Sequence, residues 1–159
     1  MIGRRMVGGF LALCLLSLPA AGLAQVDKSA YRPIDYDAIY AENGLAGKPD
    51  GDVSLFPPAL KYRISVRSTG AMRDLTPGSS ELLALWGRMS PQLPAFIARY
   101  TREVEIAVGA KTHWVLLQRE LVEDYKAEVK PGAAVDLYVV LAGAAKGELL
   151  LLATEFEAR

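Results

Sequence analysis

The sequence has very few of the side chains from which catalytic and metal sites are usually built. Cys14 is its one cysteine and His113 its one histidine among 159 residues. An intramolecular disulfide, or a zinc site made of several thiolates and imidazoles, is therefore excluded. The charges also balance, with 18 basic and 18 acidic residues, so the basic excess that is typical of nucleic-acid-binding domains is missing.

No apolar run is long enough to cross a membrane comfortably, and the run near the N-terminus has the form of a secretory signal. Arg4 and Arg5 precede the apolar stretch 6–18, and the small residues Gly22 and Ala24 follow it. This order predicts a signal peptide over residues 1–24, cleaved after Ala24. An uncleaved membrane anchor is the alternative, although the stretch is short for one.

Cleavage at this position would change the composition of the chain. Removing 24 of the 159 residues leaves 135, a length that suits one domain. Cys14, Arg4 and Arg5 leave with the signal, so 16 basic and 18 acidic residues remain, a formal net charge of −2. We therefore expect a periplasmic or secreted protein with no cofactor, no metal, no transmembrane segment after cleavage and no nucleic-acid partner.

The first part of the mature chain, residues 25–58, is predicted to be an extended N-terminal arm. Tyr31, Tyr36 and Tyr40 are spaced irregularly among acidic residues, and a glycine-rich, turn-forming stretch follows them. We expect the arm, either extended throughout or with one helical turn, to lay these aromatic rings on the domain that follows.

The domain, residues 59–159, begins with a strict two-residue alternation. Apolar Leu60, Tyr62, Ile64 and Val66 alternate with polar Lys61, Arg63, Ser65 and Arg67. This period predicts a half-buried first strand. Its basic side chains are candidate ligand-binding residues, and an ordinary solvated face is the alternative interpretation.

A helical insert is predicted over residues 79–98, after a loop over 69–78. Ser79 or Ser80 is expected to cap its helix, and Ser90-Pro91 to end it. The apolar side of this helix consists of Leu82, Leu83, Leu85, Trp86 and Met89. We expect this side to cover the outer face of the strand that carries Trp114.

The rest of the chain predicts four more strands and one short helix. Strands are expected over residues 100–108, 112–118, 135–141 and 148–156, and a helix with apolar spacing over 121–129. Five strands with a helix between the third and fourth is the order of the OB-fold. The predicted fold is therefore mainly β (α+β): a five-stranded OB-like barrel with one short helix between strands 3 and 4 and a helical insert between strands 1 and 2.

The stretch from Tyr100 to Phe156 resembles a group of uncharacterised exported bacterial proteins. The similar residues are His113-Trp114-Val115 with Gln118, Lys130-Pro131-Gly132, Val135-Asp136-Leu137-Tyr138-Val139-Val140 followed by Gly143, and Thr154-Glu155-Phe156. Most of these residues have structural roles. The resemblance therefore implies an OB-like small β-barrel and no particular activity.

Adjacent His113 and Trp114 are the remaining candidates for a site. His113 could act as a base only beside a nucleophile and an orienting carboxylate, and no such motif is visible. Trp114 could stack on a ligand, but the apolar run around it favours a core anchor. No catalytic or metal-binding residues are assigned, because carboxylate pairs are defined only in space.

These observations favour a non-enzymatic binding or assembly module of the bacterial envelope over an enzyme. Its partner is expected to be an envelope protein, a peptide or a glycan. A small periplasmic hydrolase that uses His113 or a carboxylate pair is the alternative. The ligand-binding candidates are Lys61, Arg63, Arg67, His113 and Trp114.

Overall fold

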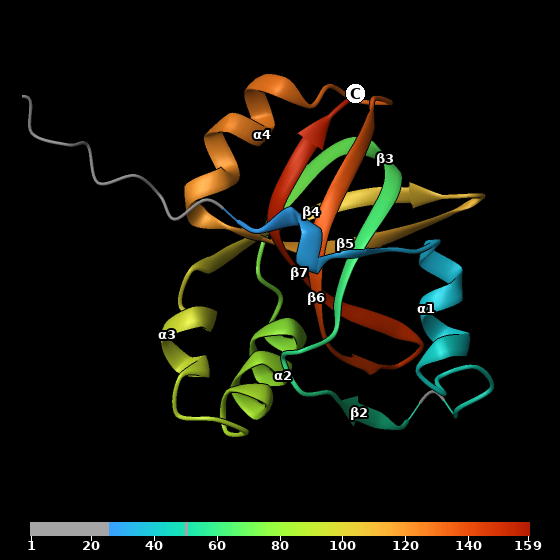
Figure 1. The fold of residues 1–159 in the computed structure, drawn as a ribbon, viewed down its shortest axis with the longest axis vertical. Helices are drawn as coiled ribbons and strands as arrows, with labels where there is room; N and C mark the ends of the chain where they lie inside the picture. The colour runs from blue at the N-terminus through green and yellow to red at the C-terminus, as the bar shows by residue number, and fades with distance from the viewer. Residues whose placement is uncertain (1–25, 50) are drawn as a thin grey trace, which may run out of the picture.

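The computed structural model describes residues 26–49 and 51–159, and its fold is mainly β with short helices (Figure 1). The predicted signal peptide, residues 1–24, lies outside the described residues. Within these described residues, seven strands form one mixed sheet. The part of the chain that the structure describes contains no helix long and apolar enough to cross a bilayer.

Hydrogen bonds close a ring through five of the strands. These are β3 (Lys61–Asp74), β4 (Tyr100–Val108), β5 (Lys111–Gln118), β6 (Ala134–Ala145) and β7 (Glu148–Ala158). The ring runs β3-β4-β5-β7-β6 and returns from β6 to β3. Only β5 and β7 pair in parallel, and the other pairs in the ring are antiparallel.

The ring surrounds the main apolar core. Along β3, Tyr62, Ile64 and Val66 are buried, which confirms the predicted alternation. Val104, Val115 and Leu137 come from three other strands to the same cluster, and all three are fully buried. Burial of one face per strand is what the two-residue period predicts.

The first strand is longer than its sequence pattern indicates. A loop was predicted over residues 69–78, but β3 continues to Asp74 and pairs again with β4 from Met72 onward. The register shifts between Ser68 and Met72, and Gly70 there has φ 85°. A bulge of this kind interrupts the alternation without ending the strand, which is why the sequence suggested a loop.

The insert between β3 and β4 contains α2 (Pro77–Gly87) and α3 (Leu93–Ile97). Thr76, not Ser79 or Ser80, caps α2: its side chain accepts a hydrogen bond from the Ser79 N–H. The helix therefore begins earlier than predicted, with Pro77 in its first turn. The insert covers the outside of β5, β6 and β7 through a second apolar cluster, which includes Leu83, Trp86, Leu93, Leu116, Val140 and Leu150.

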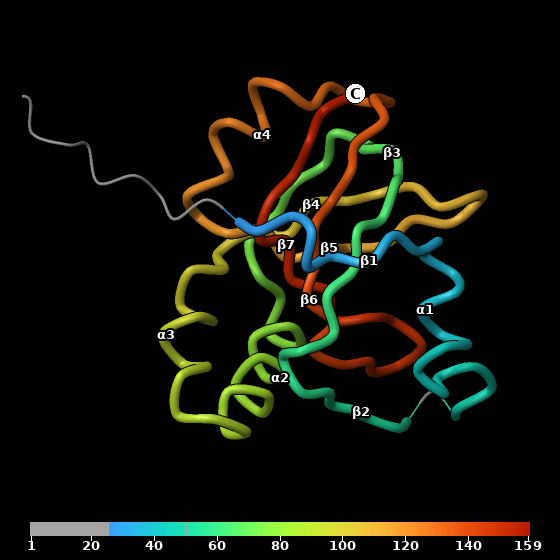
Figure 2. The backbone as a smooth tube through the Cα atoms, viewed as in Figure 1, coloured from blue at the N-terminus to red at the C-terminus, as the bar shows by residue number. Residues whose placement is uncertain are grey.

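The N-terminal segment, predicted to be an extended arm with at most one helical turn, contains more regular structure than that. It forms a 3-10 turn (Lys28–Ala30), β1 (Arg32–Pro33), α1 (Tyr36–Glu42) and β2 (Val53–Leu55). β1 pairs with β3, and β2 pairs with β6. Its tyrosines do pack on the domain as expected, because Tyr31 and Tyr36 are buried. The backbone tube in Figure 2 shows this segment running across the ring to α1 and then back along β2.

The helix predicted between the third and fourth strands of the ring is present. It consists of a 3-10 turn (Arg119–Leu121) followed by α4 (Val122–Glu128). Tyr125 on α4 packs edge-on against Phe156 of β7, with ring centroids 5.1 Å apart. From β3 onward, the element order therefore matches the predicted order, including the position of the insert.

Candidate functional site

A cleft of about 600 Å³ lies between α2 and the outer face of β5 and β7. Its floor contains Trp114, Leu116 and Leu150, and its α2 wall contains Leu82 and Leu85. Val53 of β2 and the turn between β6 and β7 complete the border. Val53 is 52% exposed and Leu85 41%, so apolar side chains face solvent at the mouth. Concave, mainly apolar surfaces with a few polar groups are typical of ligand sites.

Trp114 is not the buried core anchor that the sequence suggested. The fully buried tryptophan is Trp86, at 0% exposure, whereas Trp114 is only partly buried in the cleft floor. The insert packs on Leu116, two residues further along β5, and not over Trp114. An apolar run predicts that both faces of a strand are covered, but it does not say how far along the strand the cover extends.

The ion pair of Arg73 and Glu103 forms the polar end of the cleft. The two residues stand opposite each other on β3 and β4. Arg73 Nε donates to Glu103 Oε2 at 2.5 Å, and the Ser79 hydroxyl donates to the other carboxylate oxygen. Glu103 is 1% exposed, so its charge is stabilised by these two donors instead of by water. Both partners lie on the wall of the cleft.

Sequence reasoning missed Glu103. It stands on the polar side of an alternating strand, which ordinarily predicts a solvated side chain. Ser79 in the first turn of α2 instead reaches the carboxylate and donates a hydrogen bond to it. Because Arg73 lay in the predicted loop, nothing in its sequence context indicated that it would stand opposite Glu103.

The opposite border of the cleft is also charged. Lys146 and Gly147 form the turn between β6 and β7, and both have positive φ, 53° and 76°. This combination is typical of a tight hairpin turn and fixes the position of Lys146. Glu81 of α2 and Glu148 of β7 line the cleft with it. The lining therefore carries Glu81, Glu103 and Glu148 against Arg73 and Lys146, a small acidic excess.

His113 points to the other face of β5 from Trp114, as residues next to each other in a strand do. His113 is 7% exposed, and its Nδ1 lies 2.9 Å from Glu148 Oε2. The ring centroid lies 4.5 Å from that of Tyr36 on α1. Within residues 26–49 and 51–159, no serine hydroxyl is hydrogen-bonded to His113. The histidine thus has an orienting carboxylate but lacks the nucleophile that a triad requires.

The basic candidates Lys61, Arg63 and Arg67 lie elsewhere, and none of them lines the cleft. Lys61 Nζ lies 5.6 Å from the centre of the Tyr31 ring, and Arg67 donates to the carbonyl of Gly132 at 3.0 Å. The structure therefore does not bring these three residues together with His113 and Trp114.

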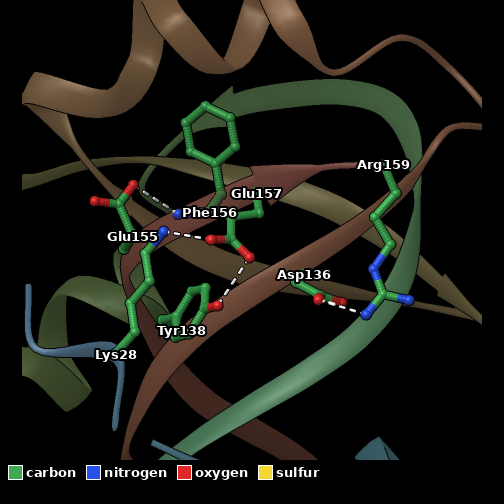
Figure 3. Close-up of polar contacts among 7 residues, drawn as sticks. All are labelled: Lys28, Asp136, Tyr138, Glu155, Phe156, Glu157 and Arg159. Carbon is green, nitrogen blue, oxygen red and sulfur yellow. Dashed lines mark hydrogen bonds and ion pairs between the residues drawn. The ribbon is translucent and has the colours of Figure 1, made fainter. Parts of the chain in front are cut away.

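The surface that carries Lys61, Arg63 and Arg67 also carries acidic side chains. Figure 3 shows Lys28 paired with Glu157, which also accepts a hydrogen bond from Tyr138, and Arg159 paired with Asp136. The hydrogen bond from Lys28 lowers the pKa of Glu157. Asp136 stands opposite Ser65 of β3 and accepts its hydroxyl at 2.6 Å. The face carries both signs of charge, and Asp136, which is 3% exposed, is buried under it.

Comparisons with known proteins give no family for this chain. No known family and no curated protein matches it. One solved structure that it resembles is of a protein provisionally assigned as an aspartyl-tRNA synthetase of Leishmania major Friedlin, with a TM-score of 0.43 and 8% sequence identity. The match covers 89% of this chain but 23% of that chain, so this chain spans about a quarter of its length. A likeness at this TM-score supports no conclusion about ligand or activity.

Proposed function

We propose that the chain is an exported, non-enzymatic binding or assembly module, and that the cleft beside α2 holds part of an envelope peptide, protein or glycan. The observation that carries this proposal is the position of Trp114. It is a large aromatic side chain left partly exposed in a concave, apolar floor. Tryptophan in such a position is enriched where proteins bind their partners.

The fold proposal that accompanies it is an OB-like barrel. The ring order β3-β4-β5-β7-β6, with α4 before β6, is the order that the OB-fold requires. Barrels of this type bind ligands on the face of their second and third strands, between two flanking loops. Here those strands are β4 and β5, and the flanking segments are the α2 insert and the Lys146–Gly147 turn. The cleft overlaps this place, because its lining includes Glu103 of β4, Trp114 of β5 and Lys146 of the turn.

Binding is favoured over hydrolysis because two of the carboxylates that line the cleft already have partners. Glu103 accepts from Arg73 and Ser79, and Glu148 contacts His113. A hydrolase would need one of these carboxylates, or His113, directed at a substrate and a water molecule. A nucleic-acid ligand is disfavoured by the acidic excess of the lining and by the mixed charges around Arg63 and Arg67.

Export is tested directly. A fusion of residues 1–24 to a reporter should carry the reporter across the inner membrane, and mass spectrometry should find Gln25 at the mature N-terminus. A mature protein that retains Met1, or that begins at a lipidated Cys14, would contradict export by ordinary cleavage.

The cleft is tested by site-specific photo-crosslinking in intact cells. A crosslinking amino acid replaces Leu85, which lines the cleft, or Met89, which is 47% exposed just beyond α2 and does not line it. We expect a discrete product from position 85 that is absent from position 89. Equal labelling from both positions, or none from position 85, would refute the cleft as the binding site.

A further inference from the structure

One edge of β5 is open beside the cleft. β5 pairs with β4 along its whole length, but with β7 only at Leu116 and Leu117. Among the described residues no strand pairs with Thr112–Val115 on the β7 side. Figure 1 shows the tip of the β4–β5 hairpin and the β6–β7 turn ending well apart.

The open edge faces the cleft and is closed on the inner side. Thr112 and Trp114 line the cleft, as do Glu148 and Leu150 on the facing strand. On the inner side, the contact between His113 and Glu148 spans the gap, and Tyr36 packs against the histidine. Approach to the edge is therefore from the side of α2.

An unpaired strand edge presents backbone donors and acceptors. In an antiparallel pair, alternate residues direct N–H and C=O at the partner, and the residues between them direct theirs away. Because one set of these N–H and C=O groups is hydrogen-bonded to β4, the other set along Thr112–Val115 points into the gap between β5 and β7. Such an edge is a template for another extended chain unless it is covered or charged.

We propose that the ligand of the cleft is a peptide in extended conformation, which adds to the sheet at the Thr112–Val115 edge of β5. Alternate side chains of the peptide contact Trp114, Leu85 and Val53. The backbone pairing supplies affinity and the cleft supplies selectivity, as in other complexes formed by strand addition. This inference rests on the proposed function, because it names the class of ligand for the same cleft.

The charges on the two walls add a requirement on the peptide. Glu81 on α2 and Lys146 in the turn both line the cleft, and neither has an ion-pair partner within the described part of the chain. A peptide with a basic residue near Glu81 and an acidic residue near Lys146 complements both walls. A glycan would use neither the charges nor the open backbone edge in this way.

The test uses short random peptides displayed as a library and selected on the mature protein. Selected peptides should alternate apolar and polar residues and should lose binding to Leu85→Asp but keep it to the matched surface variant Met89→Asp. Circular dichroism of both variants establishes that they are folded. Recovery of no peptide that depends on Leu85 would overturn the inference.

Backbone pairing is then tested on one selected peptide. Two synthetic versions carry N-methyl groups on alternate amides, in opposite phase. Strand addition predicts that one phase weakens binding roughly tenfold or more, because several hydrogen bonds to β5 are lost, and that the other phase changes it little. Equal effects of the two phases would overturn strand addition.

The proposed charges of the peptide are tested with a double variant of the cleft walls. A protein that carries both Glu81→Lys and Lys146→Glu has the charges of the two walls reversed, and it should select peptides whose charged ends are exchanged. Peptides with an unchanged order of charges would overturn this part of the inference. Photo-crosslinking from position 85 to a glycan, with no selected peptide, would leave the proposed function standing and overturn the inference. Absence of crosslinking from position 85 would contradict the proposed function itself.

Discussion

The guanidinium carbon of Arg73 lies 3.8 Å from the centroid of the Trp114 ring, in the geometry of a stacked cation–π pair. The same guanidinium group donates to the buried carboxylate of Glu103. One side chain therefore holds both the aromatic residue of the cleft floor and the charge at its polar end. The cleft depends on Arg73 for its shape as well as for its electrostatics.

Loss of Arg73 should destabilise the protein more than loss of an ordinary surface cation. Arg73→Ala leaves Glu103 buried with Ser79 as its remaining donor, and we expect a cost of about 2 kcal/mol in the free energy of unfolding. Arg102→Ala is the matched control, because Arg102 pairs with Asp74 at the surface of the same strands. It should cost at most about 1 kcal/mol. Equal values from denaturant titrations would contradict a structural role for the Arg73–Glu103 pair.

Trp86 should be the tryptophan on which stability depends. Its side chain is fully buried, and its Nε1 donates to the carbonyl of Phe56 at 2.7 Å. Trp86→Ala should cost about 3–5 kcal/mol, from lost burial and a residual cavity. Leu85→Ala, one residue away but exposed, should lie within about 0.5 kcal/mol of wild type. A small effect at Trp86 would show that the insert does not hold the outer core together.

Gly143 should be required for the β2 wall of the cleft. A Cβ atom added there would lie 2.5 Å from the Ser54 carbonyl oxygen of β2, a backbone atom that cannot move without β2. Gly143→Ala should therefore expose the amides of Val53–Leu55 to hydrogen exchange and weaken peptide binding. Gly78→Ala, where the added Cβ meets nothing within 4 Å, is the control for hydrogen exchange in β2. Unchanged protection of β2 in Gly143→Ala would contradict this packing.

Alkaline pH should unfold the protein through its buried tyrosines. Burial raises the pKa of Tyr36 and Tyr100 above the ordinary value of 10.0, so the folded state keeps protons that the unfolded state loses. The stabilisation that these two tyrosines add to the free energy of unfolding is fully present below pH 10 and is lost as the pH rises above that value. Tyr36→Phe should reduce the slope of unfolding free energy against pH in that range. An unchanged slope would show that Tyr36 does not contribute.

A period-two pattern predicted β3, whose alternate residues are buried in its first half, whereas β6 and β7 are buried on both faces over most of their length. Tyr62, Ile64 and Val66 are buried as their alternation predicts, and the short helix ends before Pro131 as expected. The strand order followed from the order of elements along the chain. These features depend on local sequence, which is why they were accessible without the structure.

The candidate site depends on contacts between distant segments, and the sequence predicted it only in part. Trp114 was among the candidates, but it was expected to be buried because its neighbours Val115 to Leu117 are apolar. Arg73 was placed in a loop, since the bulge at Gly70 interrupts the alternation of β3. Glu103 was expected in solvent, because nothing in its strand indicates that Ser79 of the insert reaches it.

The most direct test of the central claim is to measure stability and ligand capture on the same preparation of Trp114→Ala. If Trp114 is a binding residue in a partly open cleft, the variant should keep most of the wild-type free energy of unfolding. It should cost clearly less than the ~3–5 kcal/mol expected for a buried tryptophan. It should also lose the crosslink from position 85 and the binding of the selected peptide. A variant that unfolds as readily as Trp86→Ala, yet still captures the ligand when folded, would show that Trp114 belongs to the core and that the cleft is not the binding site.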